Sequence, residues 1–278
     1  MEAYTDFAQV YDTFMDETPY EEWAQFLAEV IEKYGISKPC VNVGTKSDLK
    51  QENGADLLDS ERNLVLDLGC GTGRLTELMS KKGYDMIGVD FSQEMLNIAL
   101  EKKEASGSNI LYLCQDMREL DLYSTVGTVI SICDSVNYLL EEEEVEETFR
   151  LVNNYLYPGG LFVFDFNTVY KYEQVIGDAT IAENRDDCSF IWENYYHEEE
   201  CINEYDLTIF VRDGEEEDIF RRFNETHYQR GYTLAQMKEL IKKARLKFLF
   251  ALDADTHEEP TEISERIYII ARECEKQK

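Results

Sequence analysis

The sequence has no long hydrophobic run. No apolar stretch approaches the roughly 18 residues that a membrane-spanning helix needs. The opening residues, MEAYTDFAQVYD, contain no basic region followed by an apolar one, so they do not resemble a secretory signal. These absences predict a cytoplasmic protein without a membrane partner.

The sequence also lacks the cysteine spacing that is typical of metal and redox sites. Its seven cysteines include no Cys-x-x-Cys pair, their number is odd, and several fall in runs that are predicted to be buried strands. We therefore expect reduced thiols and no metal site.

Positive charge is scarce. The chain has 27 Lys and Arg against 58 Asp and Glu, a net charge of −31, which opposes binding to a polyanion. This charge predicts that nucleic acid is not a partner. The negative charge is compatible with a cationic or neutral small molecule as substrate. Acidic runs such as 141–144 and 215–218 are also typical of an ordinary solvated surface with no role in binding. Both interpretations remain open.

The middle of the chain alternates between strand and helix patterns. Its 278 residues are 44% hydrophobic, enough for a substantial core. The patterns predict strands at 64–68, 85–89, 109–113, 127–132 and 161–165, and helices at about 73–82, 92–104 and 143–156. Such alternation is typical of an α/β fold whose parallel sheet carries helices on both faces and binds ligands beyond the carboxyl ends of its strands.

The flanking segments predict further units. Residues 1–35 are predicted to form a helical lid, 36–63 a polar surface excursion, and 64–170 with 233–278 the core. The insertion at 171–232 shows strand alternation near 189–196, 203–211 and 218–228, and we expect this antiparallel unit to cover the substrate site. Strands at about 246–252 and 265–272 close the chain, and capping boxes are predicted at Thr18 and Thr233.

A glycine-rich turn follows the first strand of the core, in Asp67-Leu68-Gly69-Cys70-Gly71-Thr72-Gly73. Glycines let the backbone approach a ligand closely, and the N–H groups at the start of the next helix face the same space. The spacing differs from the dinucleotide fingerprint Gly-x-Gly-x-x-Gly, and the Gly-Lys-Ser/Thr of a phosphate-binding loop is absent.

This turn resembles the D/E-x-G-x-G-x-G motif of the class I S-adenosylmethionine-dependent methyltransferases. Asp90, at the end of the second strand, matches the acid that holds both ribose hydroxyls in that family, and Asp116 matches the acid that receives the adenine amino group. The sequence YPGGL at 157–161 resembles the family's turn before its fifth strand. The resemblance implies a Rossmann-like seven-stranded sheet in the order 3-2-1-4-5-7-6 with strand 7 antiparallel. It also implies S-adenosylmethionine as cofactor and S-adenosylhomocysteine as product.

The resemblance implies a set of cofactor-binding residues around these motifs. They are Tyr11, Asp67, Gly69, Cys70, Gly71, Gly73, Asp90, Phe91, Ser92, Met95, Gln115, Asp116, Met117 and Cys133. Two alternatives stay open, because Asp90 could instead cap the next helix beside Ser92 and Asp116 could be an ordinary loop acid.

The N-terminal sequence YTDFAQVYD at residues 4–12 is similar to the opening of a group of Firmicutes methyltransferases. It also resembles amino-sugar N,N-dimethyltransferases and glycine/sarcosine N-methyltransferases, in which an N-terminal helix closes over the cofactor and a β insertion covers the substrate. The resemblance implies that Tyr4 and Tyr11 meet the methionine end of the cofactor, while simple aromatic packing is equally compatible with them.

Candidates for the acceptor site lie after the fourth and fifth strands and on the insertion. The catalytic candidates are Asp134, His227 and Tyr228, and the substrate-binding candidates are Ser135, Asn137, Asn167, Trp192 and Arg230. Asp134 could hold a cationic amine, accept a proton or cap the next turn. His227 has a reference pKa suited to a base but could be an exposed strand residue, and Trp192 could face a cation or pack within its sheet.

The predicted function is methyl transfer from S-adenosylmethionine to a small molecule, with nitrogen slightly favoured over oxygen as the acceptor. A base is needed only if the nucleophile arrives protonated. The sequence CDSVNY at 133–138 lacks the Asn/Asp-Pro-Pro-Tyr of many nucleic-acid N-methyltransferases. Alternatives are an RNA methyltransferase or accessory, a cofactor-binding sensor or scaffold, and a nicotinamide dehydrogenase. The sequence specifies neither the acceptor nor the oligomeric state.

Overall fold

The structure is a computed structural model that describes residues 7–39, 60–214 and 219–274. Tyr4, Cys40 and most of the polar segment predicted at 36–63 lie outside these residues. The other six cysteines form no disulfide within the described part. No helix described there is long and apolar enough to cross a membrane. The same residues contain no cluster of three or more His, Cys, Asp or Glu that could hold a metal ion.

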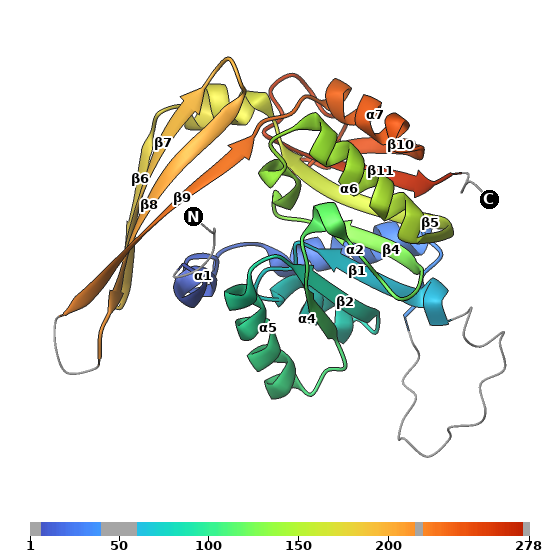
Figure 1. The fold of residues 1–278 in the computed structure, drawn as a ribbon, viewed down its shortest axis with the longest axis horizontal. Coiled ribbons are helices and arrows are strands. Elements are labelled where there is room, and N and C mark those ends of the chain that lie inside the picture. Colours follow the sequence, from blue (N-terminus) through green and yellow to red (C-terminus); the bar gives the residue numbers. More distant parts are fainter. Residues whose placement is uncertain (1–6, 40–59, 215–218, 275–278) are drawn as a thin grey trace.

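A seven-stranded sheet forms the centre of the molecule (Figure 1). Its strands are β1 (Leu64–Leu68), β2 (Asp85–Asp90), β3 (Leu111–Cys114), β4 (Val126–Ser131), β5 (Leu156–Asn167), β10 (Leu246–Asp253) and β11 (Arg266–Glu273). The order is β10-β11-β5-β4-β1-β2-β3, and β11 runs antiparallel to both of its neighbours. The predicted order and the antiparallel last strand are therefore confirmed.

Helices cover both faces of this sheet. They are α2 (Tyr20–Tyr34), α4 (Arg74–Lys81), α5 (Gln93–Ser106), α6 (Glu142–Tyr155) and α7 (Leu234–Lys243), with short helical turns η1 (Met117–Glu119), η2 (Ser135–Tyr138) and η3 (Lys171–Ile176). On β5, Phe162 and Phe164 join the core cluster with α6 and α7, whereas Leu161 and Val163 join the one with α2 and α4. Successive strand residues point to opposite faces, so a strand covered on both sides is continuously apolar.

A separate four-stranded antiparallel sheet stands beside the central one (Figure 1). It contains β6 (Thr180–Asn184), β7 (Cys188–His197), β8 (Ile202–Arg212) and β9 (Phe220–Arg230). The three predicted strands are confirmed, and β6 is an additional edge strand. Helix α1 (Ala8–Phe14) lies between this sheet and the core, where Val10 packs against Phe190, Leu207 and Ile209.

The two predicted capping boxes have different outcomes. Thr233 accepts a hydrogen bond from Gln236 N, and the Gln236 side chain accepts one from Thr233 N, so this capping box is confirmed. The one at Thr18 is wrong, because Pro19 occupies the N-cap position of α2 and has no capping side chain. The Thr18 hydroxyl instead donates to Met15 Sδ at 3.6 Å.

Replacing Phe164 by alanine should destabilise the fold strongly. Phe164 is fully buried, and its ring lies 4.7 Å from Phe162 and 4.8 Å from Phe149. We expect a loss of about 3–5 kcal/mol in the free energy of unfolding because the cavity left behind cannot be refilled. Urea unfolding followed by circular dichroism measures this loss. Tyr123→Ala, at a fully exposed position, is the control and should change the value little.

Candidate functional site

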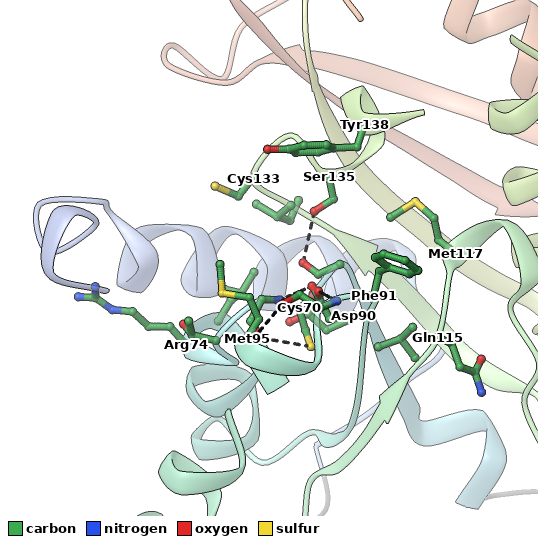
Figure 2. Close-up of a pocket in the computed structure, with 18 of the residues that line it drawn as sticks. Cys70, Arg74, Asp90, Phe91, Met95, Gln115, Met117, Cys133, Ser135 and Tyr138 are labelled. Carbon is green, nitrogen blue, oxygen red and sulfur yellow. Dashed lines mark hydrogen bonds between the residues drawn. The ribbon is translucent and has the colours of Figure 1, made fainter. Parts of the chain in front are cut away.

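A cavity of about 500 Å³ opens at the carboxyl ends of β1, β2 and β4 (Figure 2). Of the 14 residues that the family resemblance implies for the cofactor, 13 line it, and Gly73 does not. Figure 2 shows Cys70, Asp90 and Phe91 on one side of the cavity and Cys133, Ser135 and Tyr138 on the other. The fold thus brings together residues that are far apart in the sequence, as in the 4.0 Å contact between Tyr11 Oη and Cys133 Sγ, 122 positions apart.

The glycine turn needs glycine for two different reasons. Gly69, Gly71 and Gly73 all have positive φ, at 81°, 52° and 73°. A Cβ at Gly69 would lie 2.4 Å from Ser135 Oγ, and one at Gly73 would lie 2.4 Å from Tyr112 Oη, so packing excludes side chains at both. A Cβ at Gly71 would meet nothing within 4 Å. Because Gly71 lines the cavity, a side chain there would occupy ligand space, which fits a turn that cradles a cofactor.

Asp90 connects this turn to the next helix. Its carboxylate accepts hydrogen bonds from Gly71 N at 2.7 Å and Ser92 N at 2.9 Å, and burial raises its pKa. Ser92, not Asp90, caps α5, because Ser92 Oγ accepts from Met95 N at 3.1 Å. A carboxylate offers about four acceptor positions. Asp90 therefore retains capacity for two hydroxyl donors from a ligand in the cavity.

Asp67 lies beneath the turn and is 2% exposed. Burial raises its pKa to about 7, although the hydrogen bond from Thr76 Oγ1 at 2.6 Å opposes that shift. The side chain anchors the end of β1 to the first turn of α4, while part of the residue still lines the cavity.

Asp116 is the N-cap residue of η1 and is paired with an arginine that the sequence analysis did not identify. It accepts hydrogen bonds from Arg118 N at 2.9 Å and Arg118 Nη2 at 2.6 Å. Burial acts to raise the pKa of Asp116, but the contacts with Arg118 outweigh it and leave the pKa lowered. The side-chain amide of Gln115 forms hydrogen bonds with the backbone of Asp121, so its polar atoms are already paired although the residue lines the cavity. An amino group bound at Asp116 would share the carboxylate with Arg118.

Helix α1 is attached to the glycine turn by a polar contact that the sequence analysis also missed. Asp12 accepts a hydrogen bond from Thr72 Oγ1 at 2.7 Å and forms an ion pair with Lys102 at 2.5 Å. Arg74 Nη1 donates to Met15 O at 2.9 Å. These bonds hold Tyr11 over the cavity. Asp12 ends the YTDFAQVYD sequence, so that resemblance was the signal that could have identified it.

Ser135 and Asp134 follow β4. Ser135 lines the cavity, and its hydroxyl donates to Gly69 O at 3.3 Å. Asp134 accepts from Gln229 Nε2 at 2.6 Å and pairs with Arg266 at 3.2 Å. It does not cap η2 through its side chain, so the capping interpretation is wrong. Asp134 belongs to a charged cluster with Arg266 and the buried Asp165.

Three of the other predicted substrate residues, Asn137, Asn167 and Arg230, join the small sheet to the core, whereas Trp192 packs within the small sheet. Asn137 Nδ2 donates to Asn167 O at 2.9 Å and Arg230 O at 2.7 Å, and Asn167 N donates back to Asn137 Oδ1 at 2.8 Å. Trp192 packs on Tyr205 with ring centres 4.8 Å apart. Asn137, Asn167, Trp192 and Arg230 do not line the cavity in the described structure.

His227 and Tyr228 lie on opposite faces of β9. His227 is 2% exposed, so the exposed-strand interpretation is wrong, and its Nδ1 lies 3.1 Å from the hydroxyl of Tyr138, which lines the cavity. Tyr228 is 42% exposed and donates to Glu204 at 3.3 Å. Strand alternation directs Tyr228 away from the cavity, so its predicted catalytic role is not supported.

Comparisons with known proteins agree with this geometry. Residues 65–160 match the family model described as a methyltransferase domain. The chain is 35% identical over 272 residues to a candidate methyltransferase of Geobacillus sp. (strain WCH70), covering 97% of this chain and 99% of that protein.

Two solved structures share the fold over nearly the whole chain. An S-adenosylmethionine-dependent methyltransferase from Clostridium acetobutylicum ATCC 824 has a TM-score of 0.79, with 28% identity and coverage of 98% of this chain and 99% of that one. An amino pentose methyltransferase from Micromonospora echinaspora, with S-adenosylmethionine bound, has a TM-score of 0.67, with 16% identity and 99% coverage of both chains. The second likeness, at this identity, concerns the fold alone.

Replacing Asp67 by asparagine should change how stability depends on pH. A folded-state pKa near 7, above the unfolded value of about 3.9, means that the folded chain binds the extra proton between these values. The free energy of unfolding of the native protein, relative to Asp67→Asn, should therefore fall as pH rises from about 4 to about 7 and then level off.

Urea unfolding at several pH values measures this difference. Asp255→Asn, which changes an exposed carboxylate, is the matched control and should leave the native pH dependence in place. A pH-independent difference between the native protein and Asp67→Asn would contradict the prediction.

Proposed function

The chain belongs to the class I S-adenosylmethionine-dependent methyltransferases and uses S-adenosylmethionine as cofactor, and we propose that it methylates a small-molecule acceptor. The observation that carries this proposal is a cavity at the strand ends that is lined by Gly69, Gly71, Asp90, Asp116 and Tyr138. Asp90 and Tyr138 lie on opposite sides of it (Figure 2). We favour a nitrogen acceptor slightly over oxygen.

The residues of the cavity fit the parts of the cofactor by their chemistry. Gly69 and Gly71 would lie along its methionine and ribose portions, Asp90 would accept hydrogen bonds from the ribose hydroxyls, and Asp116 would receive the adenine amino group. When bound, S-adenosylmethionine supplies a methyl group on a positively charged sulfur that is already activated for displacement. The task of this chain is then to position the acceptor and exclude water.

Aromatic side chains support a small amine as the acceptor. Tyr11, Tyr20, Trp23 and Tyr138 line the cavity, and aromatic faces attract cations. The net charge of −31 disfavours an RNA substrate. The shared fold with an amino pentose methyltransferase agrees with an amine-bearing small molecule.

Methyl transfer to a panel of compounds tests the proposal directly. Purified protein is incubated with methyl-labelled S-adenosylmethionine and separate sets of amino sugars, other amines, alcohols, carboxylates and RNA. We expect label in one or more amines and none in RNA. Transfer to RNA alone would favour the RNA methyltransferase alternative. Cofactor binding without transfer to any set would favour a sensor or scaffold.

Replacing Asp90 by asparagine should weaken cofactor binding. The amide oxygen of asparagine can still accept from one ribose hydroxyl, so about one hydrogen bond to a charged group would be lost, and such a bond contributes about 1.5–3 kcal/mol. We therefore expect the dissociation constant of S-adenosylhomocysteine, measured by calorimetry, to rise by about 10- to 100-fold.

Asp85→Asn is the matched control for this variant. It changes a carboxylate at the opposite, exposed end of the same strand and should leave the affinity unchanged. Thermal unfolding without ligand checks that Asp90→Asn is folded. An unaltered affinity in a folded Asp90→Asn protein would remove Asp90 from the cofactor site.

A further inference from the structure

We propose that Tyr138 takes the proton from a protonated amine acceptor and that His227, held by Glu225, stores it. This inference rests on the proposed function and deepens it, because it assigns the base that an amine acceptor needs. An amine near the lysine reference pKa of about 10.4 is protonated at neutral pH and has no lone pair to attack a methyl group.

Three side chains from two elements, η2 and β9, form one line of hydrogen bonds. Tyr138 Oη on η2 lies 3.1 Å from His227 Nδ1 on β9, and His227 Nε2 lies 3.1 Å from Glu225 Oε2. The hydroxyl of Tyr205 on β8 lies 2.8 Å from Tyr138 Oη, and its ring stacks on His227 with centres 5.0 Å apart. His227 and Glu225 are only 2% and 3% exposed. Tyr138, Tyr205 and Glu225 are titratable groups that contact His227.

The carboxylate sets the direction of these hydrogen bonds. Glu225 Oε1 accepts from Phe7 N at 2.9 Å, and an ionised carboxylate can only accept. In the proposed resting state Glu225 is ionised and His227 is neutral, so His227 donates from Nε2–H to Glu225 and its Nδ1 carries no proton. Nδ1 accepts from the Tyr138 hydroxyl. The line is therefore arranged to move a proton inward, from Tyr138 toward Glu225.

Tyr138 is the member of this line that a molecule in the cavity can contact. It lines the cavity opposite Asp90, beside Ser135 and Cys133, whereas His227 and Glu225 are buried behind it (Figure 2). Asp134 is a poorer candidate for the proton acceptor. Its carboxylate is already paired with Arg266 at 3.2 Å and hydrogen-bonded to Gln229 at 2.6 Å.

The proposed step balances as follows. An acceptor R–NH₃⁺ gives one proton to Tyr138 Oη while the Tyr138 proton passes to His227 Nδ1, which leaves R–NH₂ and an imidazolium paired with Glu225. The nitrogen lone pair then forms the N–C bond as the C–S bond of the donor breaks, and that bonding pair remains on sulfur. The imidazolium proton returns through Tyr138 to water after the products leave.

The helix that closes over the cavity also contributes to this arrangement. Phe7 N, at the start of α1, donates to the same carboxylate that holds His227, and Tyr11 of α1 lines the cavity. Glu225 is thus a positioning residue whose geometry depends on the docking of α1.

Nitrogen NMR of the full chain tests the proposed tautomer without any acceptor. The sequence has only three histidines, so ¹⁵N-labelled imidazoles can be assigned with His227→Gln. We expect His227 to carry its proton on Nε2 at neutral pH, and Tyr138→Phe to shift the Nδ1 resonance of His227. An Nδ1–H tautomer, or no shift in Tyr138→Phe, would overturn the inference.

Kinetics of Tyr138→Phe with the amine found in the acceptor panel test the chemical role. We expect kcat to fall by about 100-fold at neutral pH with unchanged S-adenosylhomocysteine affinity, and the deficit to shrink as pH approaches the pKa of the amine. A structural role alone would give a deficit that is constant with pH. Tyr195→Phe, an exposed tyrosine on β7, is the matched control and should behave like the native protein.

The outcomes of the two experiments are distinct. Equal kcat in Tyr138→Phe and native protein, or a pH-independent deficit, would overturn this inference and leave the proposed function intact. Cofactor binding without methylation of any amine would overturn the proposed acceptor class, and the inference would fail with it.

Discussion

The hydrogen bond from Gly71 N to Asp90, at 2.7 Å, is the interaction on which the cofactor site depends. It joins the turn after β1 to the end of β2. The loops that follow these two neighbouring parallel strands are therefore held in a fixed position relative to each other. Gly71 presents this N–H group with a φ of 52°, a conformation that glycine adopts readily and other residues resist. The same carboxylate also accepts Ser92 N, which places the start of α5 at the cavity edge.

A second buried polar junction fixes the small sheet relative to the core. Asn137 bonds the backbone of both Asn167 and Arg230, while Asp134 accepts from Gln229 on β9. Buried amide and carboxylate groups of this kind cost free energy unless they are satisfied, so they define one docking geometry rather than many. This junction brings His227 to within hydrogen-bonding distance of Tyr138, a residue 89 positions away. Residues predicted to bind substrate thus hold the wall of the cavity in place.

The features that the sequence predicted are those with a local signal. The central strands, the glycine turn and the positions of Asp90 and Asp116 follow from short apolar runs and motif spacing. Strand β6 was missed because Thr180–Asn184 is a short, largely exposed edge strand without regular alternation. Asp12 and Glu225 were missed because their roles arise from tertiary contacts, such as the one that joins Glu225 to Phe7 across 218 positions. Tyr228 was named as a catalytic candidate together with His227, although the side-chain period of a strand directs neighbouring residues to opposite faces.

Acidic side chains at the carboxyl ends of the central strands couple the stability of the fold to cofactor binding. Asp67 and Asp90 end β1 and β2, burial raises the pKa of both, and neither forms an ion pair with a basic side chain in the described part of the chain. Asp165, at the end of β5, differs because Arg266 lies 3.7 Å away. Acids desolvated without a cationic partner cost stability in the free protein. A bound cofactor that donates hydroxyl hydrogen bonds to Asp90 would offset part of this cost, so its binding free energy and the stability of this edge of the sheet would be thermodynamically coupled. The edge that weakens the free protein is therefore the edge that cofactor binding would stabilise.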